Sequence, residues 1–303
     1  MSDVSSITDF LNPLNLHELS HDEGYQVGQI GSNVLVYDNE MPDLEQADVI
    51  LVGCGEERGN GIERSSAAPD TIRHQFYSLY YWHKDVRLAD IGNVKTGASL
   101  SDTYAALRTV VAELLDIGKI VVILGGSHDL TLAQYDAYKS LNRIIEAAGI
   151  DALIDLHIEN PLRSRNFLME MLTGEPNYIR HYNHIAFQSY FVNPLMLETM
   201  DKLRFDCYRV GMVKERIEEM EPVLRNSNLL SFDLAALQHS GGPSNYLTPN
   251  GLNGEEACTL ARFAGMSPNL SSMGIYGYSV ENDVQQLTAK QVAQMVWFLF
   301  AER

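Results

Sequence analysis

The chain has 303 residues and a mass of 33.9 kDa, and 45% of its residues are hydrophobic, which is enough for a full core. Its 22 Lys and Arg residues against 40 Asp and Glu residues give a formal net charge of -18 at pH 7. This charge would repel phosphate backbones and anionic membrane surfaces, so it argues against nucleic acid and membranes as partners.

The cysteines and the N-terminus indicate the compartment. Cys54, Cys207 and Cys258 are odd in number and far apart, which predicts neither a disulfide framework nor a thiolate zinc site. The chain does not begin with a basic segment followed by an apolar run. No stretch reaches the roughly 18 apolar residues that a membrane span needs. We therefore expect a protein of the reducing cytoplasm.

Strand and helix patterns alternate along the first half of the chain. A continuous apolar run at residues 47–53 leads into a polar, Gly-rich loop at 54–61. This pattern is typical of a buried parallel strand followed by a ligand-binding loop. The other elements expected here are a strand around 33–37, a helix at 67–80, an amphipathic helix at 101–117, a strand at 120–124 and a helix that runs to about residue 148.

The same alternation continues through the second half. The expected strands lie at 151–156, 184–189, 207–210, 228–233 and 272–278, and the expected helices at 214–220, 254–263 and 288–303. Longer loops are expected after residue 156 and at 240–250. With no internal repeat and no linker, this order predicts a single three-layer α/β/α domain, residues 1–303, around a mainly parallel sheet.

The stretch I-D-L-H-I-E at residues 154–159 places three ligand-type side chains at alternate positions. In an extended segment, Asp155, His157 and Glu159 would share one face. Unpaired charges are costly to bury, and a bound cation would remove that cost. The alternative is a strand end that has reached solvent, where these would be ordinary exposed polar residues.

Two other strand ends supply possible partners. His128 follows the strand at 120–124 through the turn of Gly125 and Gly126, and Asp233 ends the strand at 228–233. The carboxyl ends of parallel strands meet at one edge of a sheet, so these groups should converge. A cluster of imidazole and carboxylate groups without thiolates favours Mn over Zn or Fe. Taken alone, His128 could equally be a capping or packed ring.

Three motifs in this order resemble those of the ureohydrolase family, which comprises arginase, agmatinase and formimidoylglutamase. The sequences G-G-S-H-D at 125–129, D-L-H-I-E at 155–159 and S-F-D-L-A-A-L-Q-H at 231–239 are similar to the family patterns G-G-D-H-S, D-A-H-x-D and S-x-D-x-D-x-x-D-P. Weaker similarities lie at 59–61, 72–73, 247–252 and 272–289. The chain is most similar to formimidoylglutamase.

The resemblance implies a three-layer α/β/α fold with about eight parallel strands and a trimeric or hexameric assembly. It also implies two Mn ions that activate a hydroxide to attack the carbon of an amidine or guanidine substrate. On the matched positions, His128 would bind the first ion and His157 the second. Asp155 and Asp233 would bridge both ions, and Glu159 stands where the family has an Asp on the first ion.

The departures from the family patterns concern the second ion and the substrate. Ala235 stands at the position of the second Asp of S-x-D-x-D, and Gln238 and His239 replace Asp-Pro. Gly277 aligns with a Glu that helps to hold the cationic group, and Ser127 replaces the Asp before the His. The remaining carboxylates at 155, 159 and 233 would not neutralise two divalent ions. We therefore expect one bound Mn ion rather than two.

Two functions remain open. The first is a metal-dependent hydrolase that cleaves a linear amidine C–N bond with a metal-bound hydroxide and an impaired second metal site, in which Asn160 would contact substrate unless it only forms a turn. The second is an inactive pseudoenzyme of the same fold, with a binding or assembly role and with or without a metal, motivated by Ala235, Gln238 and Gly277.

Overall fold

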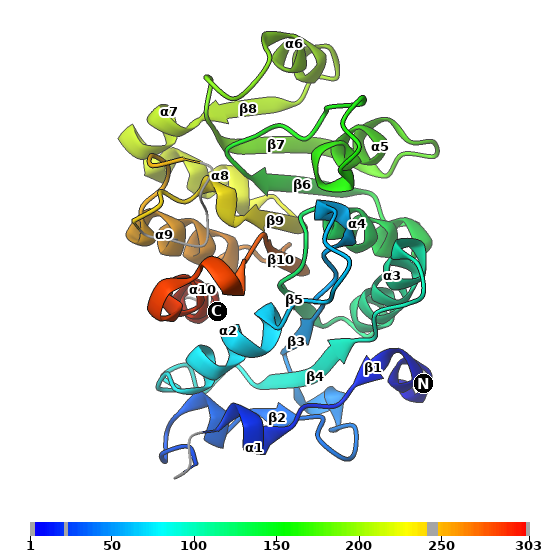
Figure 1. Cartoon of the computed structure of the whole chain (residues 1–303), viewed down its shortest axis with the longest axis vertical. Coiled ribbons are helices and arrows are strands. Elements are labelled where there is room, and N and C mark those ends of the chain that lie inside the picture. Colours follow the sequence, from blue (N-terminus) through cyan, green and yellow to red (C-terminus); the bar gives the residue numbers. More distant parts are fainter. Residues whose placement is uncertain (1–3, 21–23, 241–247, 301–303) are drawn as a thin grey trace.

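The protein is built on one ten-stranded sheet (Figure 1). The computed structural model describes residues 4–20, 24–240 and 248–300. The strand order is β1-β4-β3-β5-β10-β9-β6-β7-β8, and β2 pairs with β4. All pairings are parallel except that of β1 with β4. The strands are β1 Leu11–Asn12, β2 Leu35–Val36, β3 Val49–Gly53, β4 Leu88–Val94, β5 Ile120–Leu124, β6 Ile145–Ile150, β7 Ile179–Phe187, β8 Asp206–Arg209, β9 Leu229–Asp233 and β10 Ser272–Tyr276.

Helices cover both faces of the sheet, which gives the expected three layers (Figure 1). Helices α3 and α4 pack together on one face, and α2, α9 and α10 pack together on the other. The helices are α1 Leu16–Leu19, α2 Ala68–Tyr77, α3 Leu100–Asp116, α4 Leu130–Ser140, α5 Phe167–Thr173, α6 Pro194–Lys202, α7 Val210–Glu215, α8 Met220–Arg225, α9 Gly254–Gly265 and α10 Leu287–Leu299. None of the helices in the described part of the chain is long and apolar enough to cross a membrane.

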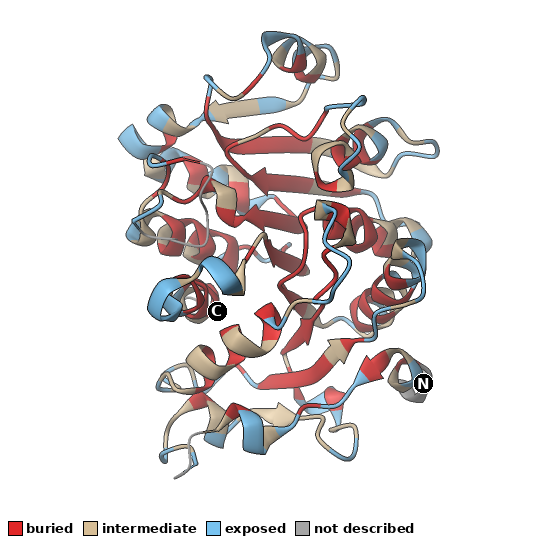
Figure 2. Ribbon diagram, in the orientation of Figure 1, coloured by how far each residue is buried: buried red, intermediate tan, exposed pale blue. Residues whose placement is uncertain are grey.

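The central strands are apolar on both faces because both faces are covered. Val49 and Leu51 of β3 belong to the core on the α2, α9 and α10 side, whereas Ile50 and Val52 belong to the core on the α3 and α4 side. Figure 2 shows the central strands buried and the outer surfaces of the helices exposed. Continuous apolar strands of this kind are typical of parallel sheets. The predicted fold class is therefore confirmed.

Two predicted elements around residue 150 are wrong. The helix expected to reach residue 148 ends at Ser140, and the strand expected at 151–156 is β6, Ile145–Ile150. Helix α4 ends because Asn142 adopts a φ of 54°, the left-handed conformation that stops a helix and that Asn tolerates better than most residues. Residues 151–157 form neither strand nor helix.

Strand β4 and helices α5 and α6 were not predicted. The sequence of β4 is not a continuous apolar run because it contains Asp90 and Asn93. Both side chains accept hydrogen bonds from Arg73 of α2. The guanidinium of Arg73 donates to the two carboxylate oxygens of Asp90 at 2.8 and 2.9 Å and to Asn93 Oδ1 at 2.5 Å. The side chains of Arg73 and Asp90 are fully buried. A buried ion pair with this fork geometry fixes α2 on the sheet.

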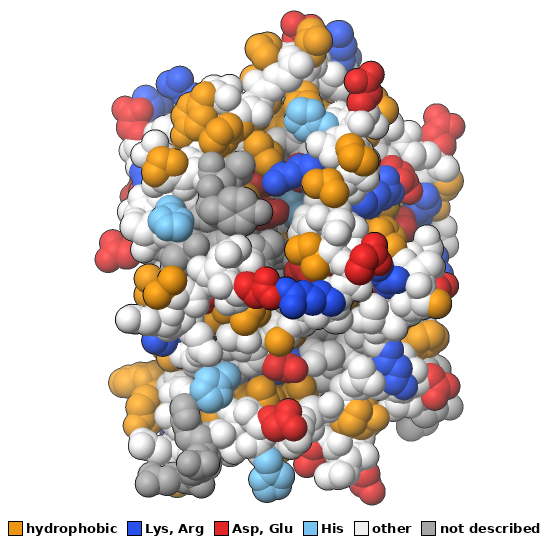
Figure 3. All heavy atoms as spheres, in the orientation of Figure 1, with side chains coloured by type: hydrophobic (Ala, Val, Ile, Leu, Met, Phe, Trp, Pro, Cys, Tyr) orange, Lys and Arg blue, Asp and Glu red, His pale blue; other side chains and the backbone are white. Residues whose placement is uncertain are grey.

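Figure 3 shows one face of the molecule in space-filling form. Acidic and basic side chains are interspersed with apolar ones, and among the described residues in this view the basic side chains form no broad patch. This distribution agrees with the acidic composition.

The Arg73–Asp90 pair generates a prediction about stability. Replacing Arg73→Met should lower the free energy of unfolding by about 3–5 kcal/mol, because the Asp90 carboxylate would stay buried without its partner. Denaturant unfolding followed by circular dichroism measures this change. The matched control is Arg87→Met, which breaks an exposed pair with Asp48 and should have a much smaller effect. Equal losses in the two variants would contradict the structural importance given to the buried pair.

Candidate metal centre

Three of four adjacent strands deliver acidic and imidazole side chains to the carboxyl edge of the sheet. In the order β5-β10-β9-β6, His128 follows β5, Asp233 ends β9 and Asp151 follows β6 directly. Gly126 makes the β5 turn possible: its φ is 83°, and a Cβ there would lie 2.3 Å from Leu130 Cδ1 and 2.5 Å from a backbone oxygen. Only glycine fits such a close turn, which places His128 at the sheet edge.

His128 lies among three buried carboxylates. Its Nδ1 lies 3.0 Å from Asp155 Oδ2 and 3.2 Å from Asp233 Oδ2. The third carboxylate, Asp151 Oδ2, is 3.4 Å away. The other ring nitrogen, Nε2, lies 3.0 Å from Ser231 Oγ. Ligand atoms of His128, Asp151 and Asp233 all lie within 4.8 Å of one another, which is close enough to surround one ion.

Burial and mutual charge perturb this cluster. Burial lowers the pKa of His128, but the charge of Asp233 and the close contacts of Nδ1 with the carboxylates of Asp151 and Asp155 raise it more, so the pKa is well above its ordinary value. Burial raises the pKa of Asp151, and the charge of Asp155 adds to this rise. Burial also raises the pKa of Asp233, against the attraction of His128. The positive charge of His128 is thus too small to balance the three carboxylates around it.

The donor atoms fit a single divalent cation. Asp151 Oδ2 and Asp155 Oδ1 are buried, and within the described part of the chain neither has a hydrogen-bond donor. One imidazole and three carboxylates form a hard, mostly oxygen ligand set that suits Mn²⁺. An ion among these four side chains would engage two buried oxygens that otherwise accept no hydrogen bond within the described residues, and it would supply the missing charge.

The structure brings together only part of the predicted ligand set. His128, Asp155 and Asp233 meet in the cluster, whereas His157 and Glu159 are exposed on the loop outside it. The expectation that residues 155, 157 and 159 share a strand face is wrong because this segment is not a strand. The His157 N–H donates to Arg165 O at 3.0 Å, and residues 158–159 form a turn. Binding of a metal by the clustered residues stays a prediction.

Asn160 has the turn-forming role that was the alternative to substrate contact. Its Oδ1 accepts the backbone N–H of Leu162 at 2.9 Å, and its carbonyl accepts from Asn166 Nδ2 at 2.8 Å. These bonds shape the loop between the cluster and α5. A contact between Asn160 and substrate stays a prediction.

Asp151 was missed, although the sequence carries a signal for it. The pattern D-A-H-x-D fits residues 151–155 at three of its four specified positions but fits residues 155–159 at only two. The structure supports the first alignment, because Asp151 and Asp155 both lie at the cluster. In this alignment Leu153 stands at the His position. This match was missed because the strand was predicted six residues too far along the chain.

Ala235 and Gly277 lie against Asp233 and help to place it. The Asp233 carboxylate accepts the backbone N–H of Ala235 at 2.7 Å, as the cap of a short 3₁₀ turn over Leu234–Ala236. Gly277 has a φ of 80°, and a Cβ there would lie 2.6 Å from Asp233 Oδ1. A Glu at position 277 would therefore clash with this arrangement of Asp233. The local packing does not accommodate the Glu that the family pattern has at this position.

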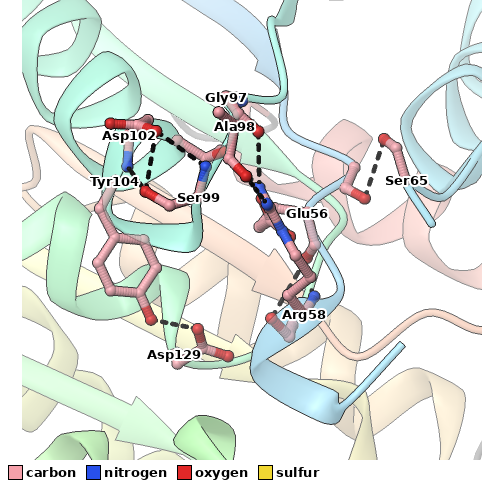
Figure 4. Close-up of polar contacts among 12 residues, drawn as sticks. Glu56, Arg58, Ser65, Gly97, Ala98, Ser99, Asp102, Tyr104 and Asp129 are labelled. Carbon is pink, nitrogen blue, oxygen red and sulfur yellow. Dashed lines mark hydrogen bonds and ion pairs between the residues drawn. The ribbon is translucent and has the colours of Figure 1, made fainter. Parts of the chain in front are cut away.

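The loop after β3 is bound to the segment before α3 (Figure 4) and to the turn that carries His128. Arg58 pairs with Glu56 at 2.5 Å and donates to the carbonyls of Gly97 and Ala98 at 3.0 and 2.9 Å. The Glu56 carbonyl in turn accepts the Ser127 N–H at 2.8 Å. These bonds tie the loop to the segment before α3 and to the residue before His128.

Next to His128, Asp129 is a buried carboxylate on the same turn. Figure 4 shows the Tyr104 hydroxyl of α3 donating to Asp129. The backbone of Gly59 also packs closely against this carboxylate, where a Cβ would lie 1.8 Å from Asp129 Oδ1. Helix α3 and the loop after β3 therefore both fix the position of the His128 turn.

Two further buried titratable groups flank the cluster and were not identified from the sequence. Glu57 accepts from Asn60 Nδ2 at 2.9 Å, and burial raises its pKa to about 7, with the charges of Asp129 and Asp233 adding to the rise. Burial lowers the pKa of His184 on β7 to about 4, so its ring is neutral at pH 7. Neither residue belongs to a motif, so only the folded arrangement reveals them.

Comparison with known proteins extends the likeness to nearly the whole chain. The family model described as "Arginase family" matches residues 47–301. A formimidoylglutamase from Macrococcus caseolyticus is 25% identical over 284 residues, which cover 88% of each chain. The structure of Bacillus subtilis formimidoylglutamase has a TM-score of 0.81 at 16% identity and covers 93% of this chain and 94% of that one. Trypanosoma cruzi formiminoglutamase, solved with Mn²⁺, has a TM-score of 0.78 at 16% identity and covers 87% and 95%. At these identities the structures show the shared fold.

The raised pKa of His128 generates a prediction about metal binding. Because a ligating imidazole must be neutral, Mn²⁺ should displace about one proton from the cluster at pH 7. Calorimetric titration with Mn²⁺ in two buffers of different ionisation enthalpy measures the number of protons released. The exposed-histidine variant His157→Gln should keep the buffer dependence, whereas His128→Asn, which lacks a proposed ligand, should give no heat of Mn²⁺ binding. An enthalpy that does not depend on the buffer in the unmodified protein would contradict the protonated state of His128.

Proposed function

Because the chain belongs to the arginase family, we propose that it hydrolyses a C–N bond of a linear amidine with one bound Mn²⁺ ion. Membership of the family and the relatives named formimidoylglutamase support a metal-dependent amidine hydrolase. The observation that carries the one-ion proposal is the buried cluster of His128, Asp151, Asp155 and Asp233. These relatives favour formimidoylglutamate as the substrate over arginine or agmatine.

The proposed ligand set would complete the coordination shell of a first ion but provides no further ligands for a second. In the corrected alignment, His128 and Asp155 serve the first ion, and Asp151 and Asp233 are the carboxylates that the family shares between two ions. Leu153 and Ala235 stand where the second ion would find its own His and Asp. Neither side chain offers a ligand atom. One ion per chain follows from this set.

When bound, the ion would supply Lewis acidity, which activates water as a nucleophile at neutral pH. The side chains of the cluster hold their positions without reorganisation, because the Gly126 turn, the Asp233 cap and the loop after β3 fix them. A buried carboxyl with a pKa of about 7, such as Glu57, can take up or release a proton at neutral pH. We therefore propose Glu57 as the group that donates a proton to the departing amine.

The groups that this chain lacks, relative to the family patterns, determine the expected rate of hydrolysis. Electrostatic contributions of the kind made by a second ion, or by a carboxylate that holds a cationic amidine, are each worth about 3–4 kcal/mol, a factor of roughly 10² to 10³. With Leu153, Ala235 and Gly277 at these positions, the proposed enzyme is slow compared with a two-ion enzyme of the same fold.

A second candidate function is a catalytically inactive member of the family with a binding or assembly role. The observation that favours it is the joint replacement at residues 153, 235 and 277 of groups that the family patterns place at the site. We further propose, on the resemblance alone, a single domain over residues 1–303, a trimeric or hexameric assembly and a cytoplasmic location.

The assay of hydrolysis separates the two candidates. The protein loaded with Mn²⁺ should release formamide from formimidoylglutamate, and removal of metal with EDTA should abolish this activity until Mn²⁺ is restored. The Asp155→Asn variant should lose at least about 100-fold in kcat/KM, because a ligand at the reacting centre is lost. The matched control is Glu159→Gln on the same loop, which should retain the unmodified rate.

Two results would contradict the hydrolase. One is the absence of product from formimidoylglutamate, arginine and agmatine by the Mn²⁺-loaded protein, which would favour the inactive member. The other is an equal loss of activity in Glu159→Gln and Asp155→Asn, which would restore Glu159 to the site and contradict the ligand set.

A further inference from the structure

We infer that Arg165 supplies, beside the candidate metal centre, the positive charge that a second metal ion would otherwise bring. The inference rests on the proposed one-ion site and explains how three buried carboxylates can be neutralised with a single divalent ion. It assigns a function to a residue that belongs to none of the sequence motifs.

The geometry places the guanidinium of Arg165 against the cluster. Arg165 Nη1 lies 3.7 Å from Asp155 Oδ1, the buried oxygen that has no hydrogen-bond donor among the described residues. The Arg165 side chain is 32% exposed and that of Asp155 only 2%. The pair therefore connects the rim of the site to its buried interior, and the charge of Arg165 also acts on Asp233.

The backbone around Arg165 is held in place on both sides. Arg165 ends the 3₁₀ turn Arg163–Arg165, where its N–H donates to Leu162 O at 3.0 Å and its carbonyl accepts the His157 N–H at 3.0 Å. This turn also contacts the short 3₁₀ turn Arg58–Asn60 of the loop after β3. The backbone from which the Arg165 side chain extends toward Asp155 is thus part of the fold around the cluster.

A charge count shows why Arg165 matters. Asp151, Asp155 and Asp233 carry three negative charges when ionised, and His128 is neutral when it ligates a metal. One divalent ion together with Arg165 balances these three charges. Two divalent ions together with Arg165 would leave an excess of two positive charges in a mostly buried site, which is strongly unfavourable. The apolar side chains at 153 and 235 agree with this count, since they provide no ligands for a second ion.

The first test is the effect of Arg165 on Mn²⁺ affinity, measured by calorimetric titration at fixed pH and low ionic strength. Removing a positive charge beside the site should strengthen binding, so Arg165→Gln should bind Mn²⁺ about tenfold or more tightly than the unmodified protein. Arg165→Lys should keep the unmodified affinity.

The matched control is Arg180→Gln, because Arg180 begins β7 at the opposite end of the strands and pairs with Glu146 at 2.6 Å on the exposed surface. This variant loses the same charge and should stay within about twofold of the unmodified affinity. Equal Mn²⁺ affinities in Arg165→Gln and the unmodified protein would overturn the inference, as would equal changes in the Arg165→Gln and Arg180→Gln variants.

The second test counts ions after ligands are added back. With Leu153→His and Ala235→Asp combined, the second Mn²⁺ should bind about tenfold or more weakly while Arg165 is present than when Arg165→Gln is added, because the guanidinium repels the second ion. Elemental analysis after equilibrium dialysis at increasing Mn²⁺ concentrations gives the number of ions bound, and circular dichroism confirms the fold of each variant. Equal binding of the second ion with and without Arg165 would overturn the inference.

These outcomes are distinct from failure of the proposed function. Loss of hydrolysis with a persistent effect of Arg165→Gln on Mn²⁺ affinity would contradict the enzyme but support the inference. If only Arg165→Gln binds Mn²⁺ and the unmodified protein does not, the one-ion enzyme is wrong and the charge role of Arg165 stands. If neither protein binds Mn²⁺, both proposals are wrong.

Discussion

The arrangement of this site depends on one electrostatic constraint, which is the burial of three carboxylates around one imidazole. Asp151, Asp155 and Asp233 lie within hydrogen-bond or ion-pair distance of His128 Nδ1. Like charges at such distances repel strongly in a poorly solvated environment, and two of the carboxyl oxygens lack donors among the described residues. A protonated His128 relieves part of this repulsion, and a divalent cation would relieve more. The chemistry proposed for the protein follows from this shortage of positive charge.

The fold keeps the carboxylates together against their repulsion. Because the strands are parallel, the carboxyl ends of β5, β9 and β6 lie at one edge of the sheet. Glycines at positions 126 and 277 allow backbone turns there that a side chain would block. The buried Arg73–Asp90 pair fixes α2 to β4, while Arg58 and Tyr104 fix the loop and turn beside His128. Burial of the apolar strands on both faces supplies the stability that such a strained cluster requires.

The sequence predicted the fold class, and it placed strands β3, β5 and β9 to within two residues, because fully buried parallel strands read as continuous apolar runs. It also singled out His128, Asp155 and Asp233, which the structure brings together. It failed near residue 150, where two adjacent apolar runs compete and Asn142 had to be recognised as the helix stop. That displacement brought His157 and Glu159 into the predicted site and left Asp151 out. Arg165 could not be found at all, because its position depends on the path of an irregular loop.

We propose that this arginase-family protein keeps the ligands of one ion and has apolar side chains and an arginine charge in place of the ligands of the other. Its central claim is the number of metal ions per chain. The most direct measurement is equilibrium dialysis of the unmodified protein against Mn²⁺, followed by elemental analysis. One Mn²⁺ per chain, lost in His128→Asn, is the result that the account predicts. Two ions per chain, or none, would contradict it.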